Sequence, residues 1–300
     1  MSARAKKRAI AVTPALLRRW PLPRASEEGD KHERGVALII GGATEAPGAL
    51  LLAGVAALRA GAGKLQLAGP RGIGVALGVA VPEARVFALP ETSAGNLDRQ
   101  AGQRAADYAE GADAFLVGPG MLDEDATQKM MELLLPRISR GPLVLDAIAL
   151  SALRGGRYRF SADAQVLLTP NSGEMARLTG DTFEAVERDP AGVATTVSRA
   201  LDAVVALKGP DTYIATPDGE LFQYSSGKVG LATSGSGDVL AGIAVGLLAR
   251  GATAEQAAAW AVYIHGEAGN RLARTVGAVG FLARELLSEI PKLMNALARG

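Results

Sequence analysis

The segment from Thr233 to Asp238 combines glycine, hydroxyl and carboxylate residues in an order that suits phosphate chemistry. Gly235 and Gly237 let backbone amides turn inward without obstruction by Cβ atoms, and a helix beginning there adds unpaired N–H groups and a positive dipole end. A carboxylate beside phosphate is repelled unless it handles a proton or a metal, so Asp238 is a candidate base for phosphoryl transfer. The alternative is a glycine-rich turn in which Asp238 only caps the helix. No Gly-Lys-Ser/Thr follows, which excludes a Walker loop.

Polar residues follow two other apolar runs. Lys208 begins the segment 208–212, which can hold the sugar and phosphates of a nucleotide through the lysine and turn amides; the alternative is a solvated β-turn. Asn171 can exchange hydrogen bonds with a substrate, and Glu174 can hold Mg²⁺ through water. The alternative for this second segment is helix capping by Asn171 and Ser172.

Three weaker signals complete the set of candidate residues. Asp146 ends an apolar run and can orient phosphate or metal through water, or cap a helix, and the segment 118–120 can bring backbone close to a ligand or form a plain turn. Of the two histidines, His32 lies in a polar N-terminal segment and His265 in an apolar helix. We interpret His265 as structural, because Glu267 follows at a spacing that does not suit a zinc site.

The elements expected to position these residues alternate between short apolar strands and helices. Strands are predicted at 36–40, 64–68, 114–117, 143–145, 166–168, 204–207, 213–216 and 221–224, and helices at 48–60, 124–135, 173–178, 237–249, 254–274 and 283–298. Several strands end in Gly, Asp, Asn or Lys before a helix, which indicates parallel crossover units. Residues 217–219 predict a hairpin between the last two strands. The fold class is therefore α/β with a central, mostly parallel sheet, and ligands are expected at the carboxyl ends of its strands.

Composition limits the remaining possibilities. The 300 residues, 48% hydrophobic and 21% charged, suit one globular domain over residues 35–300 after an N-terminal arm of residues 1–34. A net charge of +1 argues against a general nucleic-acid or membrane partner. The absence of cysteine excludes disulfides and thiolate chemistry and suits a reducing cytoplasm. The apolar stretch 9–12 is too short for a signal peptide, and no run is long enough for a membrane span.

The candidate segments belong to an ordered set of motifs. Its members are 38–42 with 47–49, 52–54 with 57–63, 117–120, 146–147 with 149–150, 168–170 with 173–175, 207–209, 232–242, and Tyr263 with 265–266. Taken together, from Arg34 to Leu287, these motifs resemble the ADP/ATP-dependent NAD(P)H-hydrate dehydratase family, a branch of the ribokinase-like fold. The resemblance implies a three-layer sandwich and a carbon–oxygen lyase without a fused epimerase domain, so that any epimerase is a separate protein.

The chemistry that the resemblance implies is repair of a damaged cofactor. Hydrated NADH or NADPH carries a hydroxyl group on its nicotinamide ring, and a nucleotide phosphorylates that hydroxyl so that phosphate can be eliminated. Hydroxide is a poor leaving group and phosphate a good one, which explains why a nucleotide is consumed. Bacterial-type members use ADP, giving AMP and phosphate, and others use ATP. Mg²⁺ as a bridge between phosphates, a homo-tetramer and a cytoplasmic location are implied as well.

The resemblance also implies roles for particular residues. Asp238 is implied to be the base toward the ring hydroxyl, with the amides of Gly235, Ser236 and Gly237 holding the transferring phosphoryl group. The nucleotide is implied to contact Lys208, Gly209, Pro210, Asp211, Thr212 and Gly237, and the hydrate to contact Ala49, Gly120, Asn171 and Asp238. Glu174 is implied as a metal site through water.

Some positions depart from the family pattern. Asn171 stands where the family usually has His, and Ile148 replaces a common second Asp. The pattern Asn171-x-x-Glu174 is also similar to the metal and phosphate motif of ribokinase-like small-molecule kinases. A kinase of this fold acting on a vitamin precursor is therefore an alternative function, and a non-catalytic nucleotide-binding sensor is another.

Overall fold

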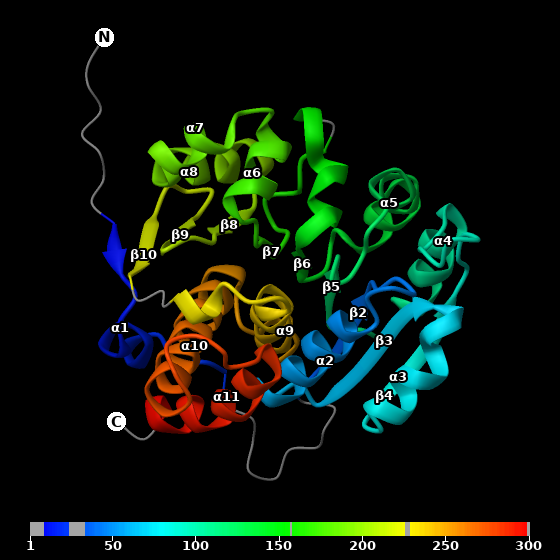
Figure 1. Ribbon diagram of the computed structural model, residues 1–300. Coiled ribbons are helices and arrows are strands. Elements are labelled where there is room, and N and C mark those ends of the chain that lie inside the picture. The colour runs from blue at the N-terminus through cyan, green and yellow to red at the C-terminus, as the bar shows by residue number, and fades with distance from the viewer. Residues whose placement is uncertain (1–8, 24–33, 157, 226–228, 299–300) are drawn as a thin grey trace.

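Ten short strands form one sheet within residues 9–23, 34–156, 158–225 and 229–298, which are the residues that the computed structural model describes (Figure 1). The strands are β1 (Ile10–Ala11), β2 (Val36–Ile40), β3 (Lys64–Pro70), β4 (Ala84–Leu89), β5 (Ala114–Val117), β6 (Leu143–Leu145), β7 (Val166–Leu168), β8 (Val204–Leu207), β9 (Asp211–Ala215) and β10 (Leu221–Ser225). Their order is β1-β10-β9-β8-β7-β6-β5-β2-β3-β4. Only the β8–β9 and β9–β10 pairs are antiparallel, so the prediction of a mostly parallel sheet is confirmed.

Helices cover both faces of this sheet. They are α1 (Pro14–Arg19), α2 (Gly48–Arg59), α3 (Gly74–Ala80), α4 (Arg99–Tyr108), α5 (Glu124–Ile138), α6 (Ser172–Thr179), α7 (Phe183–Arg188), α8 (Pro190–Leu201), α9 (Ser236–Ala249), α10 (Ala254–Thr275) and α11 (Ala283–Ala298), with 3₁₀ segments η1 (Arg71–Ile73), η2 (Ala147–Gly156) and η3 (Val229–Leu231). No helix among the described residues is long and apolar enough to cross a membrane.

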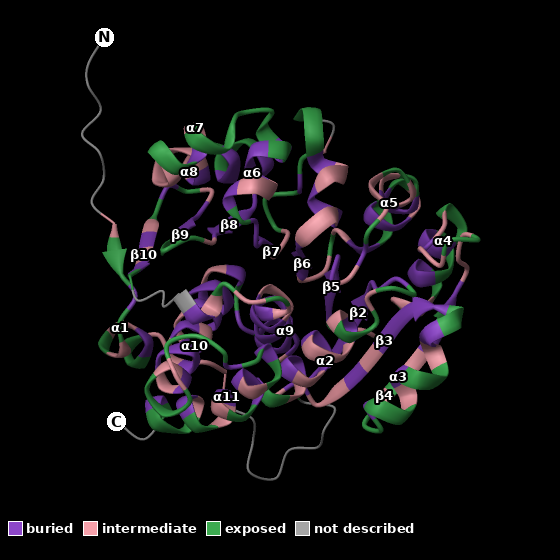
Figure 2. Cartoon of the chain, in the orientation of Figure 1, coloured by how far each residue is buried: buried purple, intermediate pink, exposed green. Residues whose placement is uncertain are grey.

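Two hydrophobic cores explain the three layers. Along β2, Ala37 and Ile39 join the core beneath α2, α9, α10 and α11, whereas Leu38 and Ile40 join the core beneath α4, α5, α6 and α8. Neighbouring residues of a strand point to opposite faces, so a strand covered on both sides needs a continuous apolar run. The five central strands β2, β5, β6, β7 and β8 are buried throughout, as the purple segments of Figure 2 show.

Glycines fix the position of α9, whose first turn carries Asp238. A Cβ atom on Gly242 would lie 2.3 Å from the Ala53 carbonyl oxygen, and one on Gly246 would lie 2.5 Å from the Ala57 carbonyl oxygen. Both carbonyls belong to α2. The two helices therefore approach backbone to backbone, and α9 is held rigidly against its neighbour.

The N-terminal segment adds to the same sheet. Strand β1 pairs in parallel with β10, and the Trp20 ring stacks on Phe222 with 5.9 Å between ring centroids. The Trp20 carbonyl accepts hydrogen bonds from the side chains of Gln256 and Trp260. The described part of residues 1–34 is thus packed on the sheet and on α10; His32 lies outside the described residues.

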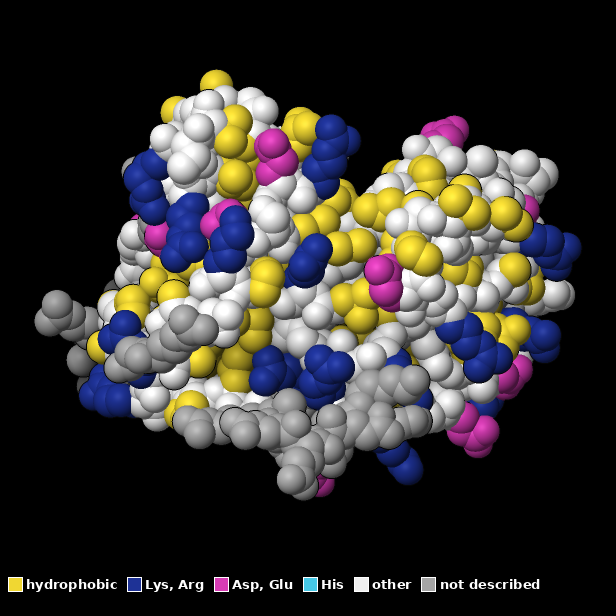
Figure 3. Space-filling view, turned by 90° about the horizontal axis from the view of Figure 1, so that it is seen from below, with side chains coloured by type: hydrophobic (Ala, Val, Ile, Leu, Met, Phe, Trp, Pro, Cys, Tyr) yellow, Lys and Arg dark blue, Asp and Glu magenta, His cyan; other side chains and the backbone are white. Residues whose placement is uncertain are grey.

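Most predicted elements occur within one or two residues of their expected bounds, but a few were missed. Strand β4 was not predicted because it is an edge strand whose first three residues are all half-buried or exposed. Helix α8 begins with Pro190 and contains several β-branched residues, which weaken the helical signal. Residues 211–212, expected in a turn, lie in β9. On the face shown in Figure 3, Lys and Arg side chains lie in separate groups with hydrophobic side chains between them.

Candidate functional site

The first turn of α9 has the geometry of an anion-binding turn. Gly235 is the N-cap residue, with a left-handed φ of +84°, and no side chain caps the helix. This left-handed conformation favours glycine, and a Cβ atom at this position would lie 2.5 Å from a methyl group of Leu52, which would have to shift. Asp238 does not cap the helix, so the amides at its start have no side-chain acceptor, although the Ser236 amide donates a 3.2 Å hydrogen bond to the Thr233 carbonyl within the turn.

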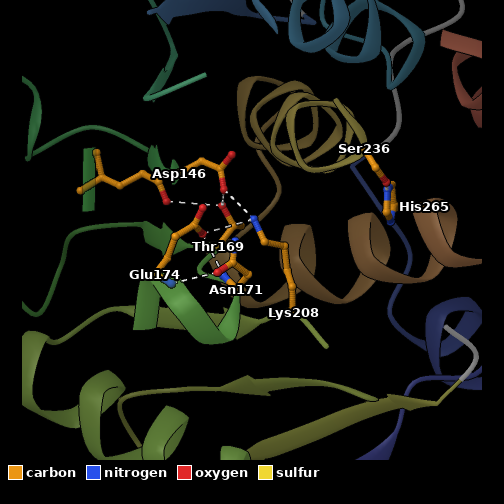
Figure 4. Close-up of polar contacts among 8 residues, drawn as sticks. Asp146, Thr169, Asn171, Glu174, Lys208, Ser236 and His265 are labelled. Carbon is orange, nitrogen blue, oxygen red and sulfur yellow. Dashed lines mark hydrogen bonds and ion pairs between the residues drawn. The ribbon is translucent and has the colours of Figure 1, made fainter. Parts of the chain in front are cut away.

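A half-buried lysine lies among three carboxylates. The Lys208 Nζ atom lies 2.9 Å from Asp146 Oδ1 and 3.7 Å from Glu174 Oε2, and Thr169 donates a 2.7 Å hydrogen bond to the same Asp146 oxygen (Figure 4). Burial alone would lower the pKa of Lys208, but Asp146, Glu174 and the nearby Asp238 outweigh it and raise the pKa. Lys208 therefore stays charged and is ready to hold a phosphate group.

The environment of Asp238 is that of a general base. Burial raises its pKa to about 7, repulsion by Asp146 and Glu174 adds to this effect, and the charge of Lys208 opposes it. A carboxyl group with a pKa near the working pH can accept a proton and release it again. Gly237, the residue before Asp238, lies close to the lysine: a Cβ atom on Gly237 would be in ordinary contact with Lys208 Nζ, at 3.5 Å.

A second polar pair joins α9 to α10. The Ser236 Oγ atom lies 2.8 Å from His265 Nε2. Burial lowers the pKa of His265 to about 4, and the positive charge of Lys208 acts in the same direction, whereas a hydrogen bond with the Ser236 backbone acts to raise it. The imidazole is consequently neutral at physiological pH.

One cavity of about 770 Å³ brings most of the predicted residues together. Among the sequence-predicted residues it is lined by Asn171, Glu174, Lys208, Gly209, Pro210, Thr212, Gly235, Ser236, Gly237 and Asp238. Sequence reasoning missed several other lining residues, namely Tyr224, Leu231, Val262, His265 and Gly266. Among these five, only the pair 265–266 gave a signal, as part of the motif set, although the sequence favours a structural interpretation of His265 itself.

Three predicted residues do not line this cavity. Asp211 is exposed at the start of β9. Ala49 and Gly120 lie against each other, because a Cβ atom on Gly120 would be 2.8 Å from the Ala49 Cβ and 2.7 Å from the Ala46 carbonyl oxygen. Ala49 lies in the first turn of α2, after β2, and Gly120 lies in the turn after β5, so both share the carboxyl end of the sheet with the cavity but stand beside neighbouring strands.

Asn171 and Glu174 form a capping box at the start of α6. The Asn171 side chain accepts a 2.8 Å hydrogen bond from the Glu174 amide, and the Glu174 carboxylate accepts a 2.8 Å hydrogen bond from the Asn171 amide. The capping alternative is thus present in the fold. Both residues also line the cavity, so capping does not remove them from the site.

A metal ion has limited support from protein side chains alone. Within the described residues, no group of three or more His, Cys, Asp or Glu is arranged to hold one. The second oxygen of Glu174, Oε1, makes no hydrogen bond or ion pair among those residues. Mg²⁺ characteristically keeps several waters and takes its remaining ligands from substrate phosphates and one or two carboxylates, which is the donor set available here.

Comparison with known proteins shows which family this chain resembles. Residues 37–292 match the family model described as NAD(P)H-hydrate dehydratase. The chain is 46% identical over 294 residues, covering 98% of it and 99% of the relative, to the ADP-dependent (S)-NAD(P)H-hydrate dehydratase of Xanthomonas campestris. It is 40% identical to a bifunctional NAD(P)H-hydrate repair enzyme of Moorella thermoacetica, covering 93% of the chain and 53% of that protein. The crystal structure of the ADP/ATP-dependent NAD(P)H-hydrate dehydratase of Bacillus subtilis, obtained with ATP and Mg²⁺, is similar at a TM-score of 0.84 and 30% identity, covering 96% of this chain and 99% of that one.

Proposed function

Since the chain belongs to the NAD(P)H-hydrate dehydratase family, we propose that it uses ADP to dehydrate hydrated NADH and NADPH, giving AMP and phosphate. The observation that carries this proposal is the Asp238 carboxyl group, which lines the cavity in the first turn of α9 with a pKa raised to about 7 by burial. A protein that only binds nucleotide has no use for a carboxylate that repels phosphate.

The reaction needs a base at one defined moment. The ring hydroxyl oxygen attacks the terminal phosphorus of ADP, a new O–P bond forms, the bond to AMP breaks, and the hydroxyl proton passes to Asp238. The C–O bond then breaks with release of phosphate, and loss of a proton from the adjacent ring carbon restores the double bond. The net change is loss of water from the hydrate and hydrolysis of ADP.

The nucleotide half of the site is supported by charge and by backbone amides. The amides of Gly235, Ser236 and Gly237 hold the transferring phosphoryl group, because they lie at an uncapped helix start. Lys208 neutralises phosphate charge, and the residues 209–212 contact the remainder of the nucleotide. Glu174 would hold Mg²⁺ through water, and the bound ion would neutralise charge on the phosphates.

The hydrate half is supported by shape. Ala49 and Gly120 form a close-packed surface beside the cavity, and Asn171 and Asp238 line the cavity itself. The nicotinamide ring is proposed to lie between these two groups, with its hydroxyl toward Asp238. The Asn171 amide N–H groups are donors for a polar substituent of the ring, since only its oxygen is used in the cap.

The decisive test is incubation of hydrated NADH or NADPH with ADP and, separately, with ATP. Recovery of NADH absorbance with release of AMP and phosphate is expected with ADP. A phosphorylated product that persists without recovery of absorbance would instead identify a small-molecule kinase. Nucleotide binding without turnover of either compound would identify a sensor. The reaction without nucleotide is the matched control.

We further propose that the enzyme works in the cytoplasm as a homo-tetramer, with hydrate epimers interconverted by a separate protein. The support is the family to which the chain belongs. Light scattering on the purified chain measures the assembly, and a monomeric mass would exclude the tetramer. An epimeric mixture of hydrate is expected to be consumed only in part.

A further inference from the structure

The pair formed by Ser236 and His265 is a polar contact of the cavity wall that the proposed reaction has not used. Ser236 lies in the first turn of α9 and His265 in the middle of α10, and both line the cavity. Their side chains point toward each other in Figure 4, with 2.8 Å between Oγ and Nε2. The pair therefore ties the anion-binding turn to a second, long helix.

The direction of the hydrogen bond follows from the surroundings of the ring. A neutral imidazole nitrogen either donates or accepts, according to the tautomer. The Ser236 backbone also forms a hydrogen bond with His265 that acts to raise the pKa of the ring. Such an interaction favours a proton on the ring. With its hydrogen on Nε2, the neutral ring is the donor to Ser236 Oγ, and NMR can test for this tautomer.

Neutrality of the ring suits this place in the molecule. Burial and the nearby charge of Lys208 both lower the pKa of His265, to about 4, so the ring does not compete with Lys208 for phosphate charge. An N–H group of a neutral ring can hold a hydroxyl oxygen without repelling the lysine. The hydroxyl hydrogen of Ser236 is then left without an acceptor among the described residues, since Oγ forms its only hydrogen bond there with His265.

We propose that His265 is a positioning residue whose Nε2–H group holds Ser236 Oγ, fixing the anion-binding turn on α10 and leaving the Ser236 hydroxyl hydrogen for a phosphate oxygen. Phosphate oxygens only accept hydrogen bonds, so a serine held in this way becomes a further donor to the transferring group. This inference rests on the proposed function, because it assigns the pair a part in phosphoryl transfer. A pair with a purely structural role would support folding and leave turnover unchanged.

Kinetics of four variants and one control test the inference. Ser236→Ala and His265→Ala are each expected to lower kcat by roughly tenfold to 100-fold, the range for a lost donor or a displaced reacting group. The double variant is expected to be little worse than either single one, because the two residues act as a unit. His265→Gln is expected to stay close to wild type, since its amide N–H can replace Nε2–H. Arg274→Gln, at an exposed position of the same helix, is the matched control and should leave kcat unchanged.

Three kinetic results would contradict the inference. Lowered melting temperatures with wild-type kcat at permissive temperature would make the pair structural and overturn the inference. Additive losses in the double variant would show that the residues do not act together. If kcat of His265→Gln were as low as that of His265→Ala, the N–H donor of His265 would not be what holds Ser236.

Nitrogen NMR of the imidazole rings tests the same inference without hydrate. The sequence has two histidines, so a His32→Gln variant assigns the signals of His265. We expect a neutral ring protonated at Nε2 from about pH 5 to about pH 8, with a shift on addition of ADP. A ring protonated at Nδ1, or signals indifferent to ADP, would overturn the inference even if the wild type repairs hydrate. Conversely, wild-type protein that fails to turn over hydrate but shows the Nε2 tautomer and the ADP-linked shift would refute the proposed function alone.

Discussion

The two halves of the carboxyl edge of the sheet differ in the kind of contact that organises them. Beyond β6, β7 and β8, charged side chains surround a cavity, with Lys208 bonded to Asp146 and close to Glu174. Beyond β2 and β5, glycines meet backbone: a Cβ atom on Gly118 would lie 1.9 Å from the Asp146 carbonyl oxygen, and one on Gly120 would lie 2.7 Å from that of Ala46. The first half is organised by electrostatics and the second by close backbone approach.

This difference teaches how each half should respond to change. A charge change in the first half alters affinity and proton transfer, because buried charges are screened little by solvent. An added methyl group in the second half alters shape, because packed backbone has no room to move away. Nucleotide binding should therefore depend on charge, and hydrate binding on shape.

The largest effect is expected at Asp238, the group that connects the halves. Asp238→Asn should lower kcat by about 10²- to 10⁴-fold, the usual contribution of a general base, while ADP affinity by calorimetry is maintained or improved. In the wild type, kcat/KM should rise with pH up to about 7, where this carboxyl ionises, and the variant should lose that rise. Full turnover by Asp238→Asn would show that another group accepts the hydroxyl proton.

The same carboxyl is expected to lower stability at neutral pH. Its folded pKa, about 7, lies above its ordinary value of 3.8, so its favourable contribution is complete below pH 3.8 and is lost as pH rises through 7. Asp238→Asn should therefore melt at a higher temperature than wild type above pH 7, with the gap narrowing toward pH 4. If wild type and Asp238→Asn had equal melting temperatures at both high and low pH, the result would contradict the raised pKa of Asp238.

The charged half is tested next, at Lys208. Lys208→Ala should raise the KM for ADP by roughly tenfold to 100-fold, more than it lowers kcat, because the lysine mainly binds. It should also move the acid limb of the pH–rate profile upward, since Lys208 lowers the pKa of Asp238. Lys208→Ala combined with Asp146→Asn should recover stability relative to Lys208→Ala alone, because it neutralises the carboxylate that Lys208 contacts at 2.9 Å. An unchanged KM for ADP would place the nucleotide phosphates elsewhere.

A smaller effect is expected in the shape-determined half. Gly120→Ala should raise the KM for hydrate by roughly tenfold and leave the KM for ADP unchanged, because the new methyl group meets Ala49 and Ala46. Gly251→Ala is the matched control: its φ of +87° resembles the +69° of Gly120, but nothing lies within 4 Å of its Cβ position. Gly251→Ala should cost about 1 kcal/mol of stability without changing either KM. If both variants change hydrate KM alike, the contact at Gly120 is irrelevant.

The smallest effect is expected at Asn171, where a structural role and a binding role coincide. Asn171→Ala should cost about 1 kcal/mol of unfolding free energy through loss of the cap, and Asn171→Asp should retain that stability. Asn171→His should be tolerated and should keep or improve the KM for hydrate if the position faces the substrate. Loss of the fold in Asn171→His, measured by circular dichroism, would reduce Asn171 to a cap.

Much of this arrangement could be predicted from local sequence. The central strands are continuous apolar runs because both of their faces are buried, and that pattern is readable without a structure. The start of α9 was predictable because glycines at 235 and 237 allow the left-handed turn and close approach that precede such a helix. Edge strand β4 and helix α8 were not, because their residues are half-exposed and their patterns weak.

The sequence by itself determined which residues end the strands and which turn can bind an anion, because those properties depend on neighbours along the chain. Only the tertiary structure decided that Asp146, Glu174 and Asp238 surround Lys208, since that depends on the order in which strands lie side by side. It also decided that Ser236 meets His265, and that Ala49 and Gly120 contact each other outside the cavity. A pKa of about 7 at Asp238 arises from burial and from charges brought together by folding, so no local pattern could have revealed it.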